Sequence, residues 1–409
     1  MLKVNNHLIV LLVIIAFMLG ALLGVIAGLL PGIHPNNTIP LILAFASFFE
    51  PLNAAIILVT AGVINSFIAF IPSIFLGAPD EDEVLSVLPG HRMLLEGRGL
   101  EAVQLTAFGG LGAIALGILL LPLLTVVIPP IYSYIRPNTH WLLAGAVIYL
   151  LFCESNIRKM GAAMVIFGLT GLLGFVVLDI FVIDQGLLPL LSGLFGVPTL
   201  IIALKERPML HETILDSAPK EKLSEIMPGI LTGALAGILA GMLPGIGSSQ
   251  AAMLVQSKNT DEDANTRHFL VTLGGISAAD MLYSLFALWL IGNPRSGIAV
   301  AVGQLIKIGV NEIILFSTVV LLAAVIGIWL TLRLARHTLR WLRHVNYQKL
   351  CGWVLIGILS LVALLSGPTG LIVLCTATGI GLLAQKLSVR RSWAMGCLIV
   401  PTILYFARI

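Results

Sequence analysis

The sequence predicts an all-α, polytopic membrane protein of about twelve helices, built from two internal repeats. The first observation is composition: of 409 residues, 58% are hydrophobic and 11% charged, whereas soluble domains carry about 25% charged residues. The second is that the apolar runs reach roughly 17–25 residues, the length that crosses a bilayer. The third is a stretch that occurs twice, GALLGVIAGLLPGI from Gly20 and GALAGILAGMLPGI from Gly233. We therefore expect a multi-pass protein of the cell membrane, surrounded by membrane lipids.

The predicted helices follow the apolar segments. Open strands would leave backbone groups unpaired in lipid, so the spans are expected to be helices. The first run is longer than a signal-peptide core and has a near-copy inside the chain, so we expect it to be a retained span. The expected helices cover residues 8–30, 53–76, 104–128, 139–153, 160–180, 187–204, 226–243, 268–291, 310–332, 350–366, 369–385 and 391–407. Two further apolar segments, 38–49 and 248–257, are too short to cross.

The remaining segments are polar loops, expected at 77–103, 205–225, 257–267 and 333–349. The acidic run from Asp80 to Glu83 is expected to be solvated. The net charge of +3 does not indicate nucleic-acid binding. The four cysteines lack metal-ligand spacing, so we expect no metal site and no cofactor other than a coupling ion.

The two similar stretches predict a duplication. At an offset of 213, ten of fourteen positions are identical. With two inserted residues, an offset of 215 places Gly77 on Gly292 and Asn65 on Asp280. We predict a first membrane repeat at 1–204, a polar linker at 205–225, and a second repeat at 226–409 with an additional C-terminal helix. Such repeats are typical of secondary transporters, and the sequence leaves parallel and inverted arrangements open.

Each repeat contains a Pro-Gly pair that ends a long helix, followed by residues that favour a new helix start. Each copy is therefore predicted to be a broken helix with a short re-entrant segment, although a plain turn at the membrane surface is an alternative. Unpaired N–H groups and carbonyls at a break inside a membrane are able to hold an anion and a cation. The candidate substrate-binding residues are Pro31, Gly32, Asn36, Asn37, Thr38, Pro244, Gly245, Ser248, Ser249 and Gln250.

Polar side chains within the spans indicate a coupling site. Asp280 lies near the centre of its apolar segment, where an ionisable group costs at least about 2.5 kcal/mol. The candidate ion-coupling residues are Asp280, Asn65, Ser66 and Ser277, with a sodium ion or a proton as the hypothetical coupling ion. A simple interhelical hydrogen bond is the alternative. Arg295 and Lys307 lie in a loop, either at a site entrance or as ordinary surface charges.

The duplicated motif, in a chain of about a dozen helices, resembles the large membrane subunit of the tripartite tricarboxylate transporters (TctA-like). The resemblance covers most of residues 8–385, and this chain is a short, divergent member of that pattern. It implies a translocation pathway for small carboxylates, driven by an ion gradient. It also implies two partners, a small membrane subunit and an extracytoplasmic binding protein. By this resemblance Pro31, Gly32, Pro244 and Gly245 line the site.

We therefore expect an ion-coupled permease for small organic anions of the carboxylate class, bound at paired helix breaks near the bilayer midplane. One alternative is a carrier or flippase for lipid-linked phosphates, because paired breaks suit a phosphate head group equally well. A second alternative is a membrane scaffold subunit that does not transport. The sequence carries no metalloprotease motif and no serine–histidine nucleophile context, so we do not expect an enzyme.

Overall fold

The computed structural model describes residues 6–30, 49–77, 83–152, 154, 156–181, 186–206, 223–242, 247–255, 262–342, 347–387 and 389–407. Every regular element in these residues is helical, so the predicted all-α class is confirmed. The α-helices are α1 (Asn6–Leu29), α3 (Pro51–Ile68), α4 (Phe70–Leu76), α5 (Val87–Leu95), α6 (Gly99–Ile135), α7 (Thr139–Phe152), α8 (Ile157–Phe175), α9 (Leu187–Leu191), α10 (Val197–Glu206), α11 (Leu223–Met242), α12 (Ser248–Leu254), α13 (Glu262–Ile291), α14 (Gly297–Leu305), α15 (Val310–Leu342), α16 (Tyr347–Leu365), α17 (Gly367–Lys386) and α18 (Gly396–Ala407). Shorter turns are the 3₁₀ elements η2 (Val84–Ser86), η3 (Arg136–Asn138) and η6 (Arg391–Met395) and the π elements η4 (Val176–Ile180) and η5 (Ser192–Gly196).

Within the described ranges, nine helical segments are long and apolar enough to cross a membrane. Three of the predicted helices are shorter apolar ones, at Thr139–Phe152, Leu187–Ile202 and Ser392–Ala407. Together they account for the twelve predicted segments. Of the two shorter predicted segments, 248–257 forms the seven-residue helix α12, and 38–48 lies outside the described residues.

The polar loop predicted at 333–349 is wrong in its first part, because α15 continues to Leu342. The extension buries Ala335 and Leu339, which lie four residues apart on one helix face. Arg336 and Arg340 lie on the exposed face. Apolar residues at this spacing form an amphipathic helix whatever the charge on the other side, and the sequence expectation gave the charges too much weight.

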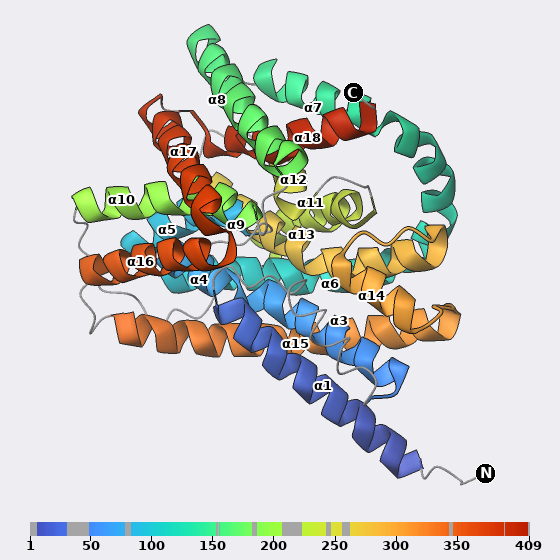
Figure 1. Cartoon of the computed structure of the whole chain (residues 1–409). Coiled ribbons are helices and arrows are strands. Elements are labelled where there is room, and N and C mark those ends of the chain that lie inside the picture. Colours follow the sequence, from blue (N-terminus) through green and yellow to red (C-terminus); the bar gives the residue numbers. More distant parts are fainter. Residues whose placement is uncertain are drawn as a thin grey trace.

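The helices form two packing groups that share one body (Figure 1). Around one apolar core lie helices α1, α3, α6, α11, α13, α14 and α15. Around the other lie α4, α5, α7 to α10, α12 and α16 to α18, together with parts of α6, α11, α13 and α15. Both groups draw helices from 1–204 and from 226–409, so the two predicted repeats do not pack as separate bodies. The duplication itself stays a prediction.

Helix α13 lies at the centre of the first group, packed along both α6 and α11. Glycines allow main-chain contact there: a Cβ atom on Gly109 would lie 2.0 Å from the carbonyl oxygen of Val271. A Cβ atom on Gly274 would lie 2.1 Å from the carbonyl oxygen of Thr106. Small residues at helix interfaces in membranes permit this close approach, which gives van der Waals contact along the whole pair.

The glycine rows of the two similar stretches have corresponding partners. Gly20 of α1 lies against Ile57 of α3, and Gly233 of α11 lies against Thr272 of α13. The partners differ by 272 − 57 = 215, the offset that the sequence predicts after two inserted residues. Gly77 and Gly292, also 215 apart, both adopt left-handed backbone angles, with φ of 63° and 61°. The contacts therefore follow the register that a duplication requires.

The same contacts give the helix directions. Further along, Gly28 lies against Ile68, and Gly241 lies against Tyr283 and the main chain of Asp280. Partner numbers rise together in both pairs, so α1 runs parallel to α3 and α11 runs parallel to α13. Helix α11 ends beside Asp280, although α13 continues to Ile291.

Replacing Gly274 by alanine should destabilise the fold, because the added methyl group meets main-chain atoms of α6 that cannot move separately. Overpacking of this kind costs about 1–3 kcal/mol, and thermal unfolding in detergent measures it. Gly168→Ala is the matched control, because no atom lies within 4 Å of its Cβ position. Equal unfolding temperatures for the two variants would contradict the close contact of α6 and α13.

Candidate functional site

Both predicted Pro-Gly breaks lie outside the described residues. The short helix that follows the second break is described. The predicted site residues that lie outside the described residues are Pro31, Gly32, Asn36, Asn37, Thr38, Pro244 and Gly245. Those that the structure places are Ser248, Ser249 and Gln250 on α12, Asn65 and Ser66 on α3, and Ser277 and Asp280 on α13.

Helix α12 carries the polar residues that follow the second break. Its N-cap is Gly247, in an extended conformation, so Ser248 and Ser249 form the first turn and do not take the capping position. All three side chains from Ser248 to Gln250 are buried. Ser248 Oγ and Gln250 Oε1 have no hydrogen-bond partner among the described residues. An unpaired polar atom in a protein interior costs about 1–3 kcal/mol, which calls for an explanation.

Asn65 lies where α3 crosses α13. A Cβ atom on Gly62, one turn before Asn65, would lie 2.6 Å from Met281 Cε, and Met281 follows Asp280. Asn65 is 5% exposed, and its Oδ1 has no partner within the described part of the chain. Ser66, the neighbouring candidate, donates its hydroxyl to Val63 O at 2.8 Å within its own helix. Asn65 Oδ1 is thus a buried amide oxygen on the part of α3 that crosses α13 near Asp280.

A guanidinium lies at the end of α11, beside Asp280. Arg295 precedes α14 and donates a hydrogen bond from Nη1 to the carbonyl oxygen of Ala240. That carbonyl cannot make its helical bond, because the residue four positions later is Pro244, which has no N–H. A Cβ atom on the next residue, Gly241, would lie 3.1 Å from the carbonyl oxygen of Asp280. In the structure Arg295 is half-buried and bonded to the end of α11.

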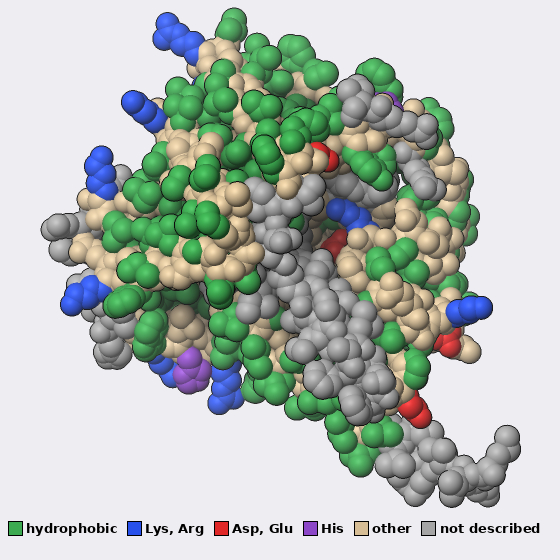
Figure 2. Space-filling model, viewed as in Figure 1, with side chains coloured by type: hydrophobic (Ala, Val, Ile, Leu, Met, Phe, Trp, Pro, Cys, Tyr) green, Lys and Arg blue, Asp and Glu red, His purple; other side chains and the backbone are tan. Residues whose placement is uncertain are grey.

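Figure 2 shows a hollow in the surface over the region of α11 and α13. Basic and acidic side chains lie close together within it, whereas most of the surrounding surface is apolar or uncharged. The loop before α14 is also tied to α6, because Asn293 Nδ2 donates to the hydroxyl of Tyr132. Charged groups of both signs therefore lie together in this hollow.

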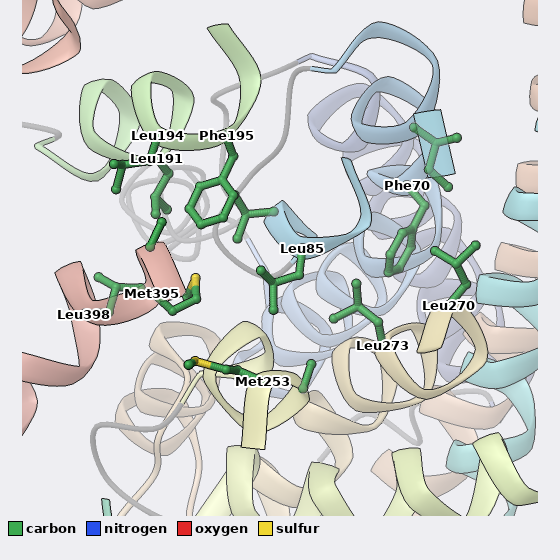
Figure 3. Packing of buried hydrophobic residues seen from close by; sticks show 14 of the residues in the cluster. Phe70, Leu85, Leu191, Leu194, Phe195, Met253, Leu270, Leu273, Met395 and Leu398 are labelled. Carbon is green, nitrogen blue, oxygen red and sulfur yellow. The ribbon is translucent and has the colours of Figure 1, made fainter. Parts of the chain in front are cut away.

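Glu83 is a buried acid that the sequence assigned to a solvated loop, and this expectation is wrong. Its exposure is 2%, and Ser277 Oγ donates to its Oε1 at 3.0 Å. Its main-chain oxygen accepts hydrogen bonds from the hydroxyls of Ser86 at 2.7 Å and Ser73 at 3.2 Å. The next residue, Val84, is fully buried and draws the turn into the apolar core that Figure 3 shows. The composition of the acidic run carries no signal for this.

Replacing Ser248 by alanine should leave the thermal stability of the protein unchanged or raise it, because the hydroxyl is buried without a partner in the described chain. Thermal unfolding without ligand is the measurement. Ser86→Ala is the matched control: its fully buried hydroxyl donates to Glu83 O at 2.7 Å outside any α-helix, so its loss should lower stability by about 1 kcal/mol. An equal loss in both variants would show that Ser248 has a structural partner.

The chain is similar to known proteins over most of its length. The model of the family described as "Tripartite tricarboxylate transporter TctA family" matches residues 14–396, a range that includes both Pro-Gly breaks. An uncharacterized protein of Methanocaldococcus jannaschii, MJ1079, is 33% identical over 387 residues, which cover 92% of this chain and 94% of that protein. No solved structure gives a significant match. The chain therefore belongs to the TctA family of tripartite tricarboxylate transporters, and it is a multi-pass membrane subunit of a transport system and not an enzyme.

Proposed function

We propose that this chain is an ion-coupled permease for small organic anions of the carboxylate class. The anion binds at the paired helix breaks, and a small membrane subunit and an extracytoplasmic binding protein work with it. The observation that carries the proposal is the convergence of Arg295 and Asp280 on the end of α11, next to α12 with its unpaired Ser248 and Gln250. A transporter binds its substrate in its interior. It therefore needs buried polar groups whose hydrogen bonds are completed only when the substrate is bound.

The anion side of the proposal rests on Arg295. The predicted spans hold no basic residue near their centres, so a multiply charged carboxylate lacked a cationic partner in the sequence. A guanidinium has five donors in a planar fork that matches carboxylate geometry. The bond to Ala240 O holds this fork at the break. Gln250 and Ser248 then supply an amide and a hydroxyl from the neighbouring helix.

The coupling side rests on the crossing of α3 and α13. Gly62 meets Met281, and Phe67 and Ala278 both lie against Gly110 of α6. Residue numbers thus rise along α3 as they fall along α13, so the two helices run in opposite directions. This direction supports inverted repeats, in which the coupling site lies where the halves meet. Asn65 and Asp280 are the polar residues at that crossing.

The alternatives that the sequence left open have less support. A lipid-linked phosphate carrier needs an apolar groove continuous with the breaks. Among the described residues, a cavity of about 630 Å³ is lined by α8, η4 and the α16–α17 corner, which are not the elements at the end of α11. A scaffold subunit would have no use for buried polar atoms without partners, since their replacement by apolar groups would stabilise it. Transport accounts for the buried polar atoms that lack partners in the described chain.

Asp280→Asn should abolish ion-driven uptake of carboxylates into proteoliposomes while the protein stays folded, because the amide cannot neutralise a cation. Uptake of radiolabelled di- and tricarboxylates, with and without an ion gradient, is the measurement. Asp179→Asn in η4, on the exposed side of the chain, is the matched control and should transport normally. Unchanged ion dependence in the Asp280 variant would reject its coupling role.

Arg295→Ala should weaken carboxylate binding at least about tenfold, the effect of losing a hydrogen bond to a charged group. Arg295→Lys should recover part of the affinity. A thermal-shift titration with a panel of carboxylates, and with inorganic phosphate for comparison, measures it. Lys307→Ala changes an exposed charge in the next loop and should bind as the parent protein does. Full affinity in both alanine variants would place the anion elsewhere, and stabilisation by phosphate alone would favour the phosphate carrier.

A further inference from the structure

We infer that the last part of α15 binds anionic phospholipid head groups through a basic and aromatic stripe, which consists of Trp329, Arg333, Arg336, His337 and Arg340. The inference goes beyond the proposed function and needs only the membrane location of the chain. Its starting point is the charge of this region: no Asp or Glu occurs between Glu312 and Ile409, whereas lysines and arginines cluster at 333–349. A basic cluster directly after a membrane span is typical of a surface that attracts anionic lipids.

The length of α15 places the stripe at the level of the lipid head groups. The helix runs from Val310 to Leu342, which is about 50 Å, whereas the hydrocarbon core of a bilayer is about 30 Å thick. Residues 313–332, 20 in all, carry no charge, and a helix of this length also spans about 30 Å. The uncharged run therefore fills the hydrocarbon core, and Arg333 is the first residue at the polar surface.

The stripe occupies the outward face of the helix. Its members recur every three or four residues, so they lie one above the other on one side. All of them are exposed, whereas Ala335, Leu339 and Leu342 on the opposite side are buried. Figure 2 shows basic side chains and a histidine together at the lower left, over this end of α15. The packing of α15 thus turns its charged side toward the surroundings of the protein.

The aromatic member of the stripe marks the edge of the hydrocarbon core. The guanidinium carbon of Arg333 lies 5.3 Å from the centroid of the Trp329 ring, within the range of a cation–π interaction. Trp329 lies one turn before Arg333, on the side of the uncharged run, and is 56% exposed. Tryptophan is enriched where hydrocarbon meets head groups, because its ring is apolar and its N–H is polar. This pair and the length of the uncharged run therefore indicate the same depth.

The same helix face is apolar within the bilayer and basic at its end. Leu322 and Val325 continue the stripe toward the middle of the span at the same spacing, and both are about half exposed. A face of this kind matches a molecule with an acyl chain and an anionic head. A guanidinium binds a phosphate through two parallel hydrogen bonds. An acidic soluble protein would match only the basic part, so the occupant that fits the whole face is an anionic phospholipid. The positive-inside rule assigns it to the cytoplasmic leaflet.

The test measures lipid binding to the purified protein in detergent. The protein is titrated with phosphatidylglycerol, which is anionic, and separately with zwitterionic phosphatidylcholine. Native mass spectrometry counts the bound lipids, and quenching of tryptophan fluorescence by brominated acyl chains reports their contact with the protein. Replacing both Arg336→Gln and Arg340→Gln should weaken phosphatidylglycerol binding at least about tenfold, because each arginine near the head groups adds attraction. Binding of phosphatidylcholine should not change.

The matched control is Arg158→Gln together with Lys159→Gln, which removes two exposed charges at the start of α8. It should bind phosphatidylglycerol as the parent protein does. An equal loss of affinity in the two double variants would overturn the inference, because net charge alone would then be the cause. Equal binding of the two lipids by the parent protein would overturn it as well.

Two further measurements separate this lipid from other occupants. Inorganic phosphate should not displace phosphatidylglycerol, because it lacks the acyl chain that covers the apolar part of the face; displacement would assign the arginines to free phosphate instead. A dimer that separates when Arg336 and Arg340 are replaced would assign the stripe to a second copy of this chain. Carboxylate binding by the same variants should equal that of the parent, so a failure of the proposed function is distinguished from a failure of this inference.

Discussion

The main-chain contact of α13 with its neighbours is the constraint on which the rest of this structure depends. Gly274 and Gly109 bring α13 and α6 to a separation at which no Cβ atom fits. Gly233 and Gly241 do the same for α11. In a bilayer the hydrophobic effect does not hold helices together, because lipid tails are as apolar as leucine, so contact area must do so. These contacts set the height of α11 along α13 and thereby place its end beside Asp280.

At the end of α11, a proline removes a hydrogen-bond donor and an arginine from another segment replaces it. Pro244 removes the donor that the Ala240 carbonyl needs, and the loop before α14 supplies Arg295 in its place. A helix end inside a membrane is tolerated only where protein or water satisfies its carbonyls. The same replacement brings a positive charge into an apolar region, where low dielectric strengthens its interaction with any anion. The side chain that satisfies this carbonyl is thus the one that we propose as the anion-binding group.

Much of this architecture follows from local sequence. Long apolar runs predict the twelve segments, and each of these segments contains an observed helix. The glycine spacing predicts close helix contacts, and the structure has them at Gly20 and Gly233. The prediction of a solvated side chain was wrong for Glu83, which is buried although the segment around it is acidic. Glu83 lies in an acidic run, and only the burial of Val84 and Leu85 on α12 and α13 turns its carboxylate away from solvent.

The sequence by itself determined the helical class, the membrane location, the family and the candidate Asn65 and Asp280, because each of these follows from composition, periodicity or a motif along one segment. Only the tertiary structure decided that Arg295 caps α11, that Glu83 meets Ser277, and that α3 and α13 cross in opposite directions. These are pairings between segments far apart in the chain. They depend on how helices with glycine faces stack, and no local pattern specifies which distant side chains that stacking brings together.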